Sequence, residues 1–354
     1  MRRSLLSGST TVFGATLLAT AMLATSAVQA QTPYGDYKAP RNSFGQPDLS
    51  GFWSNASLTP LTRPKDVGDR LVYTEEEVAT IEGRVEIEEA EANQRTDPNA
   101  PAEFRHETTV TRPEFQAAGG AVGGYNRFWL DPGAHVMRVA GKPRTSILTT
   151  ANGRIPARKD GAGSQRRSNR RPGGAYDSYE ARSLGERCII GFGRNGGPPM
   201  FANGFYNNNY HIVQSPDTVM ILVEMNHDAR IIRLNGKHRG DDVRPWFGDS
   251  IGQWDGNTLV VETINIPRTQ AFYGSWENLK VTERFTRVAK DRLHYRFTVE
   301  DPTVWDSAWG GEYEFSPLDG VIYEYACHEG NYALPGILRG ARVQEEAATA
   351  SPKN

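Results

Sequence analysis

The chain has 354 residues, and its 40 Lys and Arg residues almost balance its 42 Asp and Glu residues, for a formal net charge of −2. Such a small charge gives no general attraction to nucleic acid or to anionic lipid, so we expect neither as a partner. The 36 glycines, the 21 prolines and the 10% of aromatic residues predict many turns and short strands rather than a helical bundle.

The first 30 residues have the pattern of a cleavable secretion signal. Arg2 and Arg3 form a basic start, an uncharged stretch covers residues 12–27, and Val28 and Ala30 are the small residues that signal peptidase accepts. The uncharged stretch contains several Ser and Thr residues and is shorter than the roughly 20 apolar residues that a membrane-spanning helix needs. We therefore expect cleavage near Ala30 and a periplasmic or secreted protein with no membrane span in its mature form.

Two regions precede the part of the chain with clear strand patterns. Residues 31–105 predict an extended arm followed by one amphipathic surface helix over residues 74–93, where Thr74 and Glu77 have the spacing of a capping box. Residues 106–205 are rich in Gly and Arg and predict an irregular region with short strands.

From residue 206 onward, apolar and polar residues alternate in runs that turn signals separate. We predict strands over residues 210–214, 218–225, 229–234, 257–265, 279–288, 292–300 and 321–327. The short turns between most of them suit antiparallel neighbours. The expected fold is therefore all-β: an antiparallel meander over residues 206–343 that closes into a lipocalin-like barrel, with a β-sandwich as the alternative. Residues 344–354 are expected to form a disordered tail.

The sequence has two cysteines, Cys188 and Cys327, and both lie in the mature part. Two such thiols commonly form a disulfide in an oxidising compartment. A disulfide also requires the two Cα atoms to lie within about 7 Å, which the sequence does not specify. The pairing therefore stays open at this point.

Several strings resemble those of a family of secreted bacterial proteins. They are PDLSGFW at residues 47–53, YHIVQ at 210–214, EMNHDARII at 224–232, GDS at 248–250 and YEYACHEGNY at 323–332. The resemblance covers nearly the whole mature chain. It implies bacterial export, and it assigns no activity, cofactor or catalytic residue.

A carboxylate on an apolar strand face is the first candidate for catalysis. Alternation along residues 218–225 places Glu224 on the same face as Met220 and Leu222. Desolvation on such a face would suit Glu224 to general acid or base chemistry, unless a cation such as Arg230 compensates its charge. A structural Glu224–Arg230 ion pair is an equally valid interpretation.

Histidines supply the other candidates for proton transfer. His211 lies in a strand that can pair with the strand of Glu224, and a histidine beside a carboxylate is the ordinary form of a proton shuttle. His227, His328 and Tyr323 could donate or accept further protons. For each of them, the alternative is a structural hydrogen bond.

Aromatic and amide side chains are the residue types that line pockets for sugars and polycyclic compounds. The substrate-binding residues expected on this basis are Tyr210, Asn209, Trp246, Trp254, Asn265 and His328. Because no paired ligand spacing and no phosphate-binding loop occurs, we expect neither a metal nor a cofactor.

Two functions fit these features. The first is a periplasmic, cofactor-independent enzyme, a lyase, isomerase or hydrolase, that uses His/Glu acid–base chemistry on a carbohydrate or a hydrophobic natural product. The second is a non-catalytic secreted β-barrel that binds a ligand. The enzyme hypothesis requires His211 and Glu224 to lie within hydrogen-bond reach beside a cavity. The oligomeric state is not specified by the sequence.

Overall fold

The computed structural model describes residues 34, 37–92, 131–162, 174–191, 193–202 and 206–350. The predicted signal segment, residues 106–130 of the predicted irregular region and the last four residues of the predicted tail lie outside these described residues.

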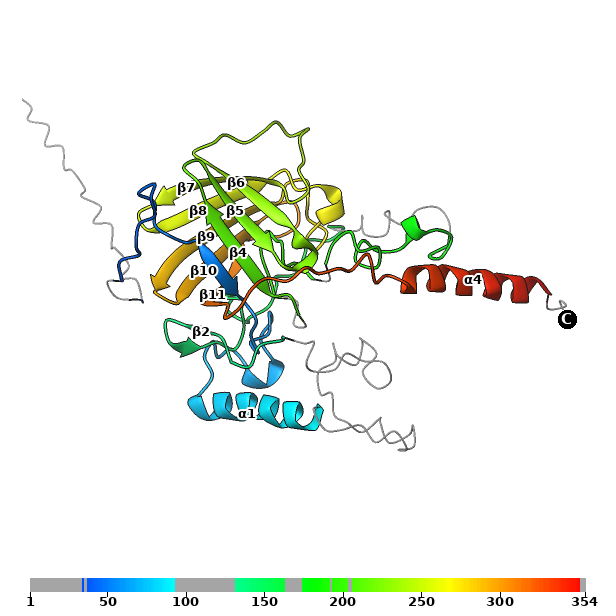
Figure 1. Cartoon of the computed structure of the whole chain (residues 1–354), viewed down its shortest axis with the longest axis horizontal. Helices are drawn as coiled ribbons and strands as arrows, with labels where there is room; N and C mark the ends of the chain where they lie inside the picture. The colour runs from blue at the N-terminus through cyan, green and yellow to red at the C-terminus, as the bar shows by residue number, and fades with distance from the viewer. Residues whose placement is uncertain are drawn as a thin grey trace, which may run out of the picture. The chain divides into compact units, whose positions relative to one another are not determined.

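A closed barrel of nine strands forms the core of the described chain (Figure 1). Its strands are β1 (Gly51–Ser54), β4 (Asn209–Gln214), β5 (Thr218–Val223), β6 (Ala229–Leu234), β7 (Asp249–Asp255), β8 (Thr258–Ile264), β9 (Lys280–Ala289), β10 (Arg292–Glu300) and β11 (Trp309–Pro317). From β4 to β11 each strand pairs with the next, and β1 lies between β11 and β4 and closes the barrel. A separate ribbon pairs β2 (Arg138–Val139) with β3 (Lys142–Pro143). The expectation of an all-β chain that closes into a barrel is therefore confirmed.

The pairing departs from a simple antiparallel meander at one place. Strands β6 and β7 are parallel, whereas the other barrel neighbours are antiparallel. Parallel neighbours need a crossover of about a dozen residues or more. Residues 235–248 form this crossover, and we call them the crossover loop.

The strand predictions differ from the structure at both closing strands. Six predicted runs correspond to β4, β5, β6, β8, β9 and β10, but residues 321–327 form no strand. Strand β11, which the sequence analysis missed, takes the closing position, and β1 comes from the part that was expected to be an extended arm.

Side chains and one chain segment fill the interior of the barrel. Tyr210, Arg230, Phe285 and Tyr295 are each less than 2% exposed. The segment around Met200 packs among them, because its N–H donates to the Tyr295 hydroxyl at 3.0 Å. The interior is therefore a packed core.

Two α-helices accompany the barrel in the described part of the chain. The predicted surface helix is α1 (Glu75–Ala92), and its capping box is formed: Thr74 N–H donates to Glu77 Oε2 at 2.8 Å, and Glu77 N–H donates to Thr74 Oγ1 at 3.2 Å. Helix α4 (Ala333–Ala350) occupies residues 344–350, which were expected to be disordered. Its Ala-rich end favours helix, which explains the difference. Among the described residues, neither helix combines the length and apolar character needed to cross a membrane.

Short 3₁₀ turns complete the described structure. They are η1 (Lys65–Val67), η4 (Tyr179–Ala181), η5 (Met225–His227) and η6 (Arg268–Gln270). Of these, η5 lies in the turn between β5 and β6, which carries part of the candidate site.

Candidate functional site

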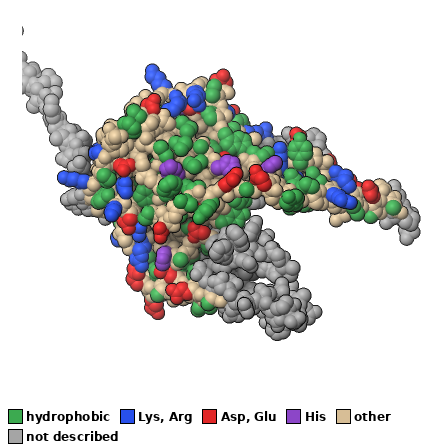
Figure 2. Space-filling model, in the orientation of Figure 1, with side chains coloured by type: hydrophobic (Ala, Val, Ile, Leu, Met, Phe, Trp, Pro, Cys, Tyr) green, Lys and Arg blue, Asp and Glu red, His purple; other side chains and the backbone are tan. Residues whose placement is uncertain are grey.

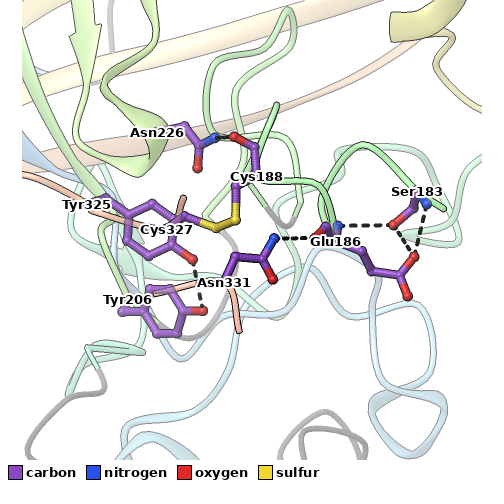
Figure 3. Close-up of a disulfide and its surroundings, with 8 residues drawn as sticks. All are labelled: Ser183, Glu186, Cys188, Tyr206, Asn226, Tyr325, Cys327 and Asn331. Atoms are coloured by element: carbon purple, nitrogen blue, oxygen red, sulfur yellow. Dashed lines mark hydrogen bonds between the residues drawn. A yellow bond between two sulfur atoms is a disulfide. The ribbon is translucent and has the colours of Figure 1, made fainter. Parts of the chain in front are cut away.

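A disulfide ties two distant parts of the chain together (Figure 3). Cys188 and Cys327 are 139 positions apart in the sequence, and their Cα atoms are 5.6 Å apart. Asn331 Nδ2 reinforces the link by donating to the Glu186 carbonyl at 2.9 Å. The pairing that the sequence left open is therefore formed, and it fixes the segment after β11 beside residues 183–191.

The β5–β6 turn, residues 224–228, meets this disulfide. Asn226 Nδ2 donates to the Cys188 carbonyl at 3.1 Å. Asn226 and His227 have left-handed backbones with φ of 58° and 45°, a conformation in which Asn and His are enriched among residues other than glycine. Val223 N–H donates to the Asp228 carbonyl at 2.7 Å and closes the turn. The local sequence thus builds a tight turn in which His227 and Asp228 are adjacent.

A cleft of about 510 Å³ lies between this turn, the crossover loop and the disulfide segments. Its lining residues are Cys188, Ile189, Asn226, His227, Asp228, Ala229, Trp246, Phe247, Tyr325, Cys327, His328 and Glu329. Of the residues predicted from sequence, His227, His328 and Trp246 meet here. The cleft therefore brings together three of the predicted site residues.

Asp228 is the lining residue that the sequence analysis missed. Burial raises the pKa of its carboxyl from 3.8 to about 7. No hydrogen bond or ion pair reaches this carboxylate from another described residue, and no neighbouring charge offsets its burial. A titration near neutral pH suits a general acid or base. Its position beside His227 could have indicated a catalytic role. Asp is also common in turns, and Asp228 lies between two predicted strands, so it was interpreted as a turn residue.

A second, much smaller cavity lies behind Asp228. Its volume is about 10 Å³, and it shares Asp228 and Phe247 with the cleft. Asn195 and Gln270 line it and are 4% and 5% exposed, and Asn195 Oδ1 and Gln270 Nε2 find no hydrogen-bond partner in the described structure. A cavity of this size and polarity is suited to one water molecule.

The predicted pair of His211 and Glu224 is not assembled as a proton shuttle. The His211 ring stacks on Phe52, with ring centroids 4.2 Å apart and planes inclined by 20°. Glu224 accepts hydrogen bonds from Asn209 Nδ2 at 2.7 Å and from Tyr323 N–H at 3.0 Å. No hydrogen bond joins His211 to Glu224 in the part of the chain that the structure describes.

Glu224 instead holds the segment after β11 against the β5–β6 turn. Its side chain is buried, and its two carboxylate oxygens connect Asn209 in β4 with the backbone of Tyr323. The Tyr323 residue itself is 72% exposed, so only its backbone takes part in this contact. Glu224, Asn209 and Tyr323 therefore have a structural role next to the cleft.

Arg230 pairs with Glu283 and not with Glu224, which corrects the predicted ion pair. Its Nη1 and Nη2 donate to the two Glu283 carboxylate oxygens at 3.0 and 2.6 Å. Tyr295 donates its hydroxyl proton to the same carboxylate at 2.8 Å. The three side chains lie in the barrel interior, and none of them lines the cleft.

Three other predicted binding residues lie outside the cleft lining. Tyr210 is fully buried, where its hydroxyl donates to the Asn195 carbonyl at 3.2 Å, and burial raises its pKa. Trp254 pairs in register with Leu259, whereas Asn265 follows the opposite end of the β7–β8 pair. At about 3.4 Å per residue, these two ends are roughly 17 Å apart. Asn265 Nδ2 donates to the Gly240 carbonyl at 3.1 Å and so positions the crossover loop.

The sequence matches no protein-family model and no curated protein. In the described part of the chain, no group of three or more His, Cys, Asp or Glu side chains is arranged to hold a metal ion.

Proposed function

We propose that this chain is an exported, cofactor-independent enzyme that performs acid–base chemistry on a small molecule in the cleft beside the disulfide. The observation that carries the proposal is the environment of the Asp228 carboxyl. Its carboxyl is partly buried without a compensating charge, its pKa is raised to about 7, and it lines the cleft together with His227 and His328. The His211–Glu224 pair that the sequence-based enzyme hypothesis required is not formed, so that version of the hypothesis is wrong, and the proposal assigns the acid–base role to Asp228, His227 and His328 instead.

The cleft supports such chemistry because it joins proton-transfer groups with flat apolar surfaces. Groups that titrate near the working pH transfer protons most effectively. Trp246 and Tyr325 line the same space and provide ring faces against which a small molecule can pack. Both requirements of a small-molecule active site are thus met by adjacent residues.

Of lyase, isomerase and hydrolase chemistry, hydrolysis is favoured by the water-sized cavity behind Asp228. Asn195 and Gln270 could hold one water there, next to the Asp228 carboxylate. In this scheme, Asp228 accepts a proton from the water as its oxygen attacks the substrate. The bond to the leaving group then breaks, and His227 or His328 in its protonated form donates a proton to that group.

Export is proposed on two grounds that agree. The first 30 residues have a secretion-signal pattern, and the two cysteines form the kind of bond that persists in oxidising compartments. We propose cleavage near Ala30 and function in the periplasm or outside the cell.

The test is an untargeted search for turnover with the purified mature protein, residues 31–354, in a metabolite extract followed by mass spectrometry. We expect at least one compound to be consumed and its rate of loss to fall about 10²- to 10⁴-fold in Asp228→Asn. Asp69→Asn, which changes an exposed carboxylate that does not line the cleft, is the matched control and should leave the rate unchanged.

Two results would contradict the proposal. Equal turnover by Asp228→Asn and the unsubstituted protein would remove Asp228 from the chemistry. No turnover of any compound would favour the second function, a non-catalytic secreted protein, with the cleft rather than the packed barrel interior as its ligand site.

A further inference from the structure

The ionisable side chains that line the cleft include carboxylates but no permanent cation. Asp228 and Glu329 are the two acidic residues of the lining, and neither Lys nor Arg is among the described residues that form it. The Asp228 carboxylate is desolvated, and no protein charge compensates it. A buried carboxylate without a partner is costly when ionised, so a ligand that supplies the missing positive charge would bind there favourably.

The aromatic residues of the cleft suit the same kind of ligand. Trp246, Phe247 and Tyr325 line it together, and the faces of such rings attract organic cations, with Trp the most effective. Figure 2 shows histidine and acidic side chains among hydrophobic ones where the barrel meets the C-terminal part of the chain. Aromatic faces beside carboxylates form the usual surroundings of a bound ammonium group.

We propose that the small molecule bound in this cleft carries a positively charged, alkylated ammonium group that lies between the Asp228 carboxylate and the aromatic faces. This inference rests on the proposed function and names the substrate class of that site. A neutral sugar or a hydrocarbon would leave the Asp228 charge uncompensated.

The Asp228 carboxyl sets how binding depends on pH. His227, His328 and Glu329 line the cleft with it, and Arg194 lines the small cavity that Asp228 shares, where its guanidinium donates to the Pro198 and Gln270 carbonyls. Acidification protonates Asp228 and so removes the negative charge that attracts a cation. Binding of an ammonium ligand should therefore strengthen as the pH rises through about 7.

The experiment compares two probes of the same shape and different charge. Choline and its uncharged carbon isostere 3,3-dimethylbutan-1-ol are titrated into the mature protein by calorimetry at pH 8 and at pH 5.5. We expect choline to bind at least tenfold more tightly than the isostere at pH 8. This preference should fall at least tenfold at pH 5.5 and in Asp228→Asn.

Two further variants keep the result interpretable. Glu329→Gln changes the exposed carboxylate of the cleft and should reduce the preference for choline by a smaller factor, whereas Asp69→Asn should leave it unchanged. Thermal melting of each variant checks that it is folded. Equal binding of choline and its isostere, or binding of neither, would overturn the inference.

The outcome is separable from that of the proposed function. Turnover that depends on Asp228, without any preference for choline, would retain the enzyme and reject the ammonium substrate class. A choline preference that depends on Asp228, without turnover, would retain the ammonium site and reject catalysis.

Discussion

The Asp228 carboxyl is partly buried and no neighbouring charge offsets its burial, so its ionisation affects the stability of the folded protein. Its pKa is about 7 in the folded chain, compared with 3.8 when unperturbed. Because the folded-state pKa is the higher one, the stabilising contribution is present below about pH 4 and is lost as the pH rises through 7. Ionised Asp228 therefore lowers the stability of the folded protein at alkaline pH.

We predict that Asp228→Asn removes this pH dependence. The variant should be more stable than the unsubstituted protein at pH 8, and the advantage should shrink steadily towards pH 4. Urea unfolding at a series of pH values measures the free energy of unfolding of both proteins. Asp69→Asn is the control and should show the same pH dependence as the unsubstituted protein. A constant difference between the two proteins across this range would contradict the burial of Asp228.

The Arg230–Glu283 pair allows a second test at the level of single residues. Both side chains are almost completely buried, at 1% and 0% exposure. Removing one partner leaves the other charge buried alone, so Arg230→Met should cost about 3–5 kcal/mol in the free energy of unfolding. The double variant Arg230→Met/Glu283→Leu should recover much of that loss in urea unfolding. A double variant less stable than Arg230→Met would refute this account.

At the residue scale, sequence reasoning identified part of the cleft. His227, His328 and Trp246 were selected as chemically useful types, and the fold brings them together. His211 and Glu224 were paired by strand alternation, but β5 ends at Val223, so alternation no longer decides where the Glu224 side chain points. Asp228 was missed because its raised pKa results from burial, which exists only in the folded chain.

At the scale of elements, the strongest local signal was the start of α1. The reciprocal hydrogen bonds of Thr74 and Glu77 satisfy two N–H groups that the helix itself leaves unpaired. We predict that Thr74→Ala destabilises the helix by about 1 kcal/mol. Hydrogen exchange of the α1 amides measures this, and it should leave the barrel amides unaffected. Unchanged exchange in α1 would show that the capping box contributes nothing.

Strands were predictable where their pattern was regular and were missed where glycine interrupted it. Strand β11 contains Gly310 and Gly311, and a Cβ at Gly310 would lie only 2.1 Å from the Phe297 carbonyl oxygen of β10. The backbones of β10 and β11 lie so close together here that only glycine fits. The apolar side chain that would mark a strand in the sequence is therefore missing. Strand β7, which was also absent from the predicted strands, contains Gly252.

At the scale of the whole molecule, closure depends on pairings that a local pattern does not encode. Strand β1 precedes β4 by more than 150 residues and pairs with both β4 and β11. The sequence predicted that the sheet closes, because long exposed edges are avoided, but not which strand closes it. The crossover between β6 and β7 was missed for the same reason.

The disulfide acts at this same scale. It closes a loop between residues 139 positions apart, which restricts the unfolded chain strongly. We predict that Cys188→Ser/Cys327→Ser lowers the free energy of unfolding by about 2–5 kcal/mol while the far-ultraviolet circular dichroism of the barrel persists. A reductant should reproduce the loss in the unsubstituted protein and have no effect on the double variant. Equal stability with and without the disulfide would contradict this prediction.

The central claim is that a partly buried, uncompensated carboxylate forms the working group of the cleft, and the titration of Asp228 tests it most directly. Carbon-13 NMR of protein labelled at the Asp carboxyl carbons, assigned by the signal missing in Asp228→Asn, gives its midpoint. The account predicts a midpoint near pH 7. A midpoint near pH 4 would show an ordinary solvated carboxylate and would contradict it.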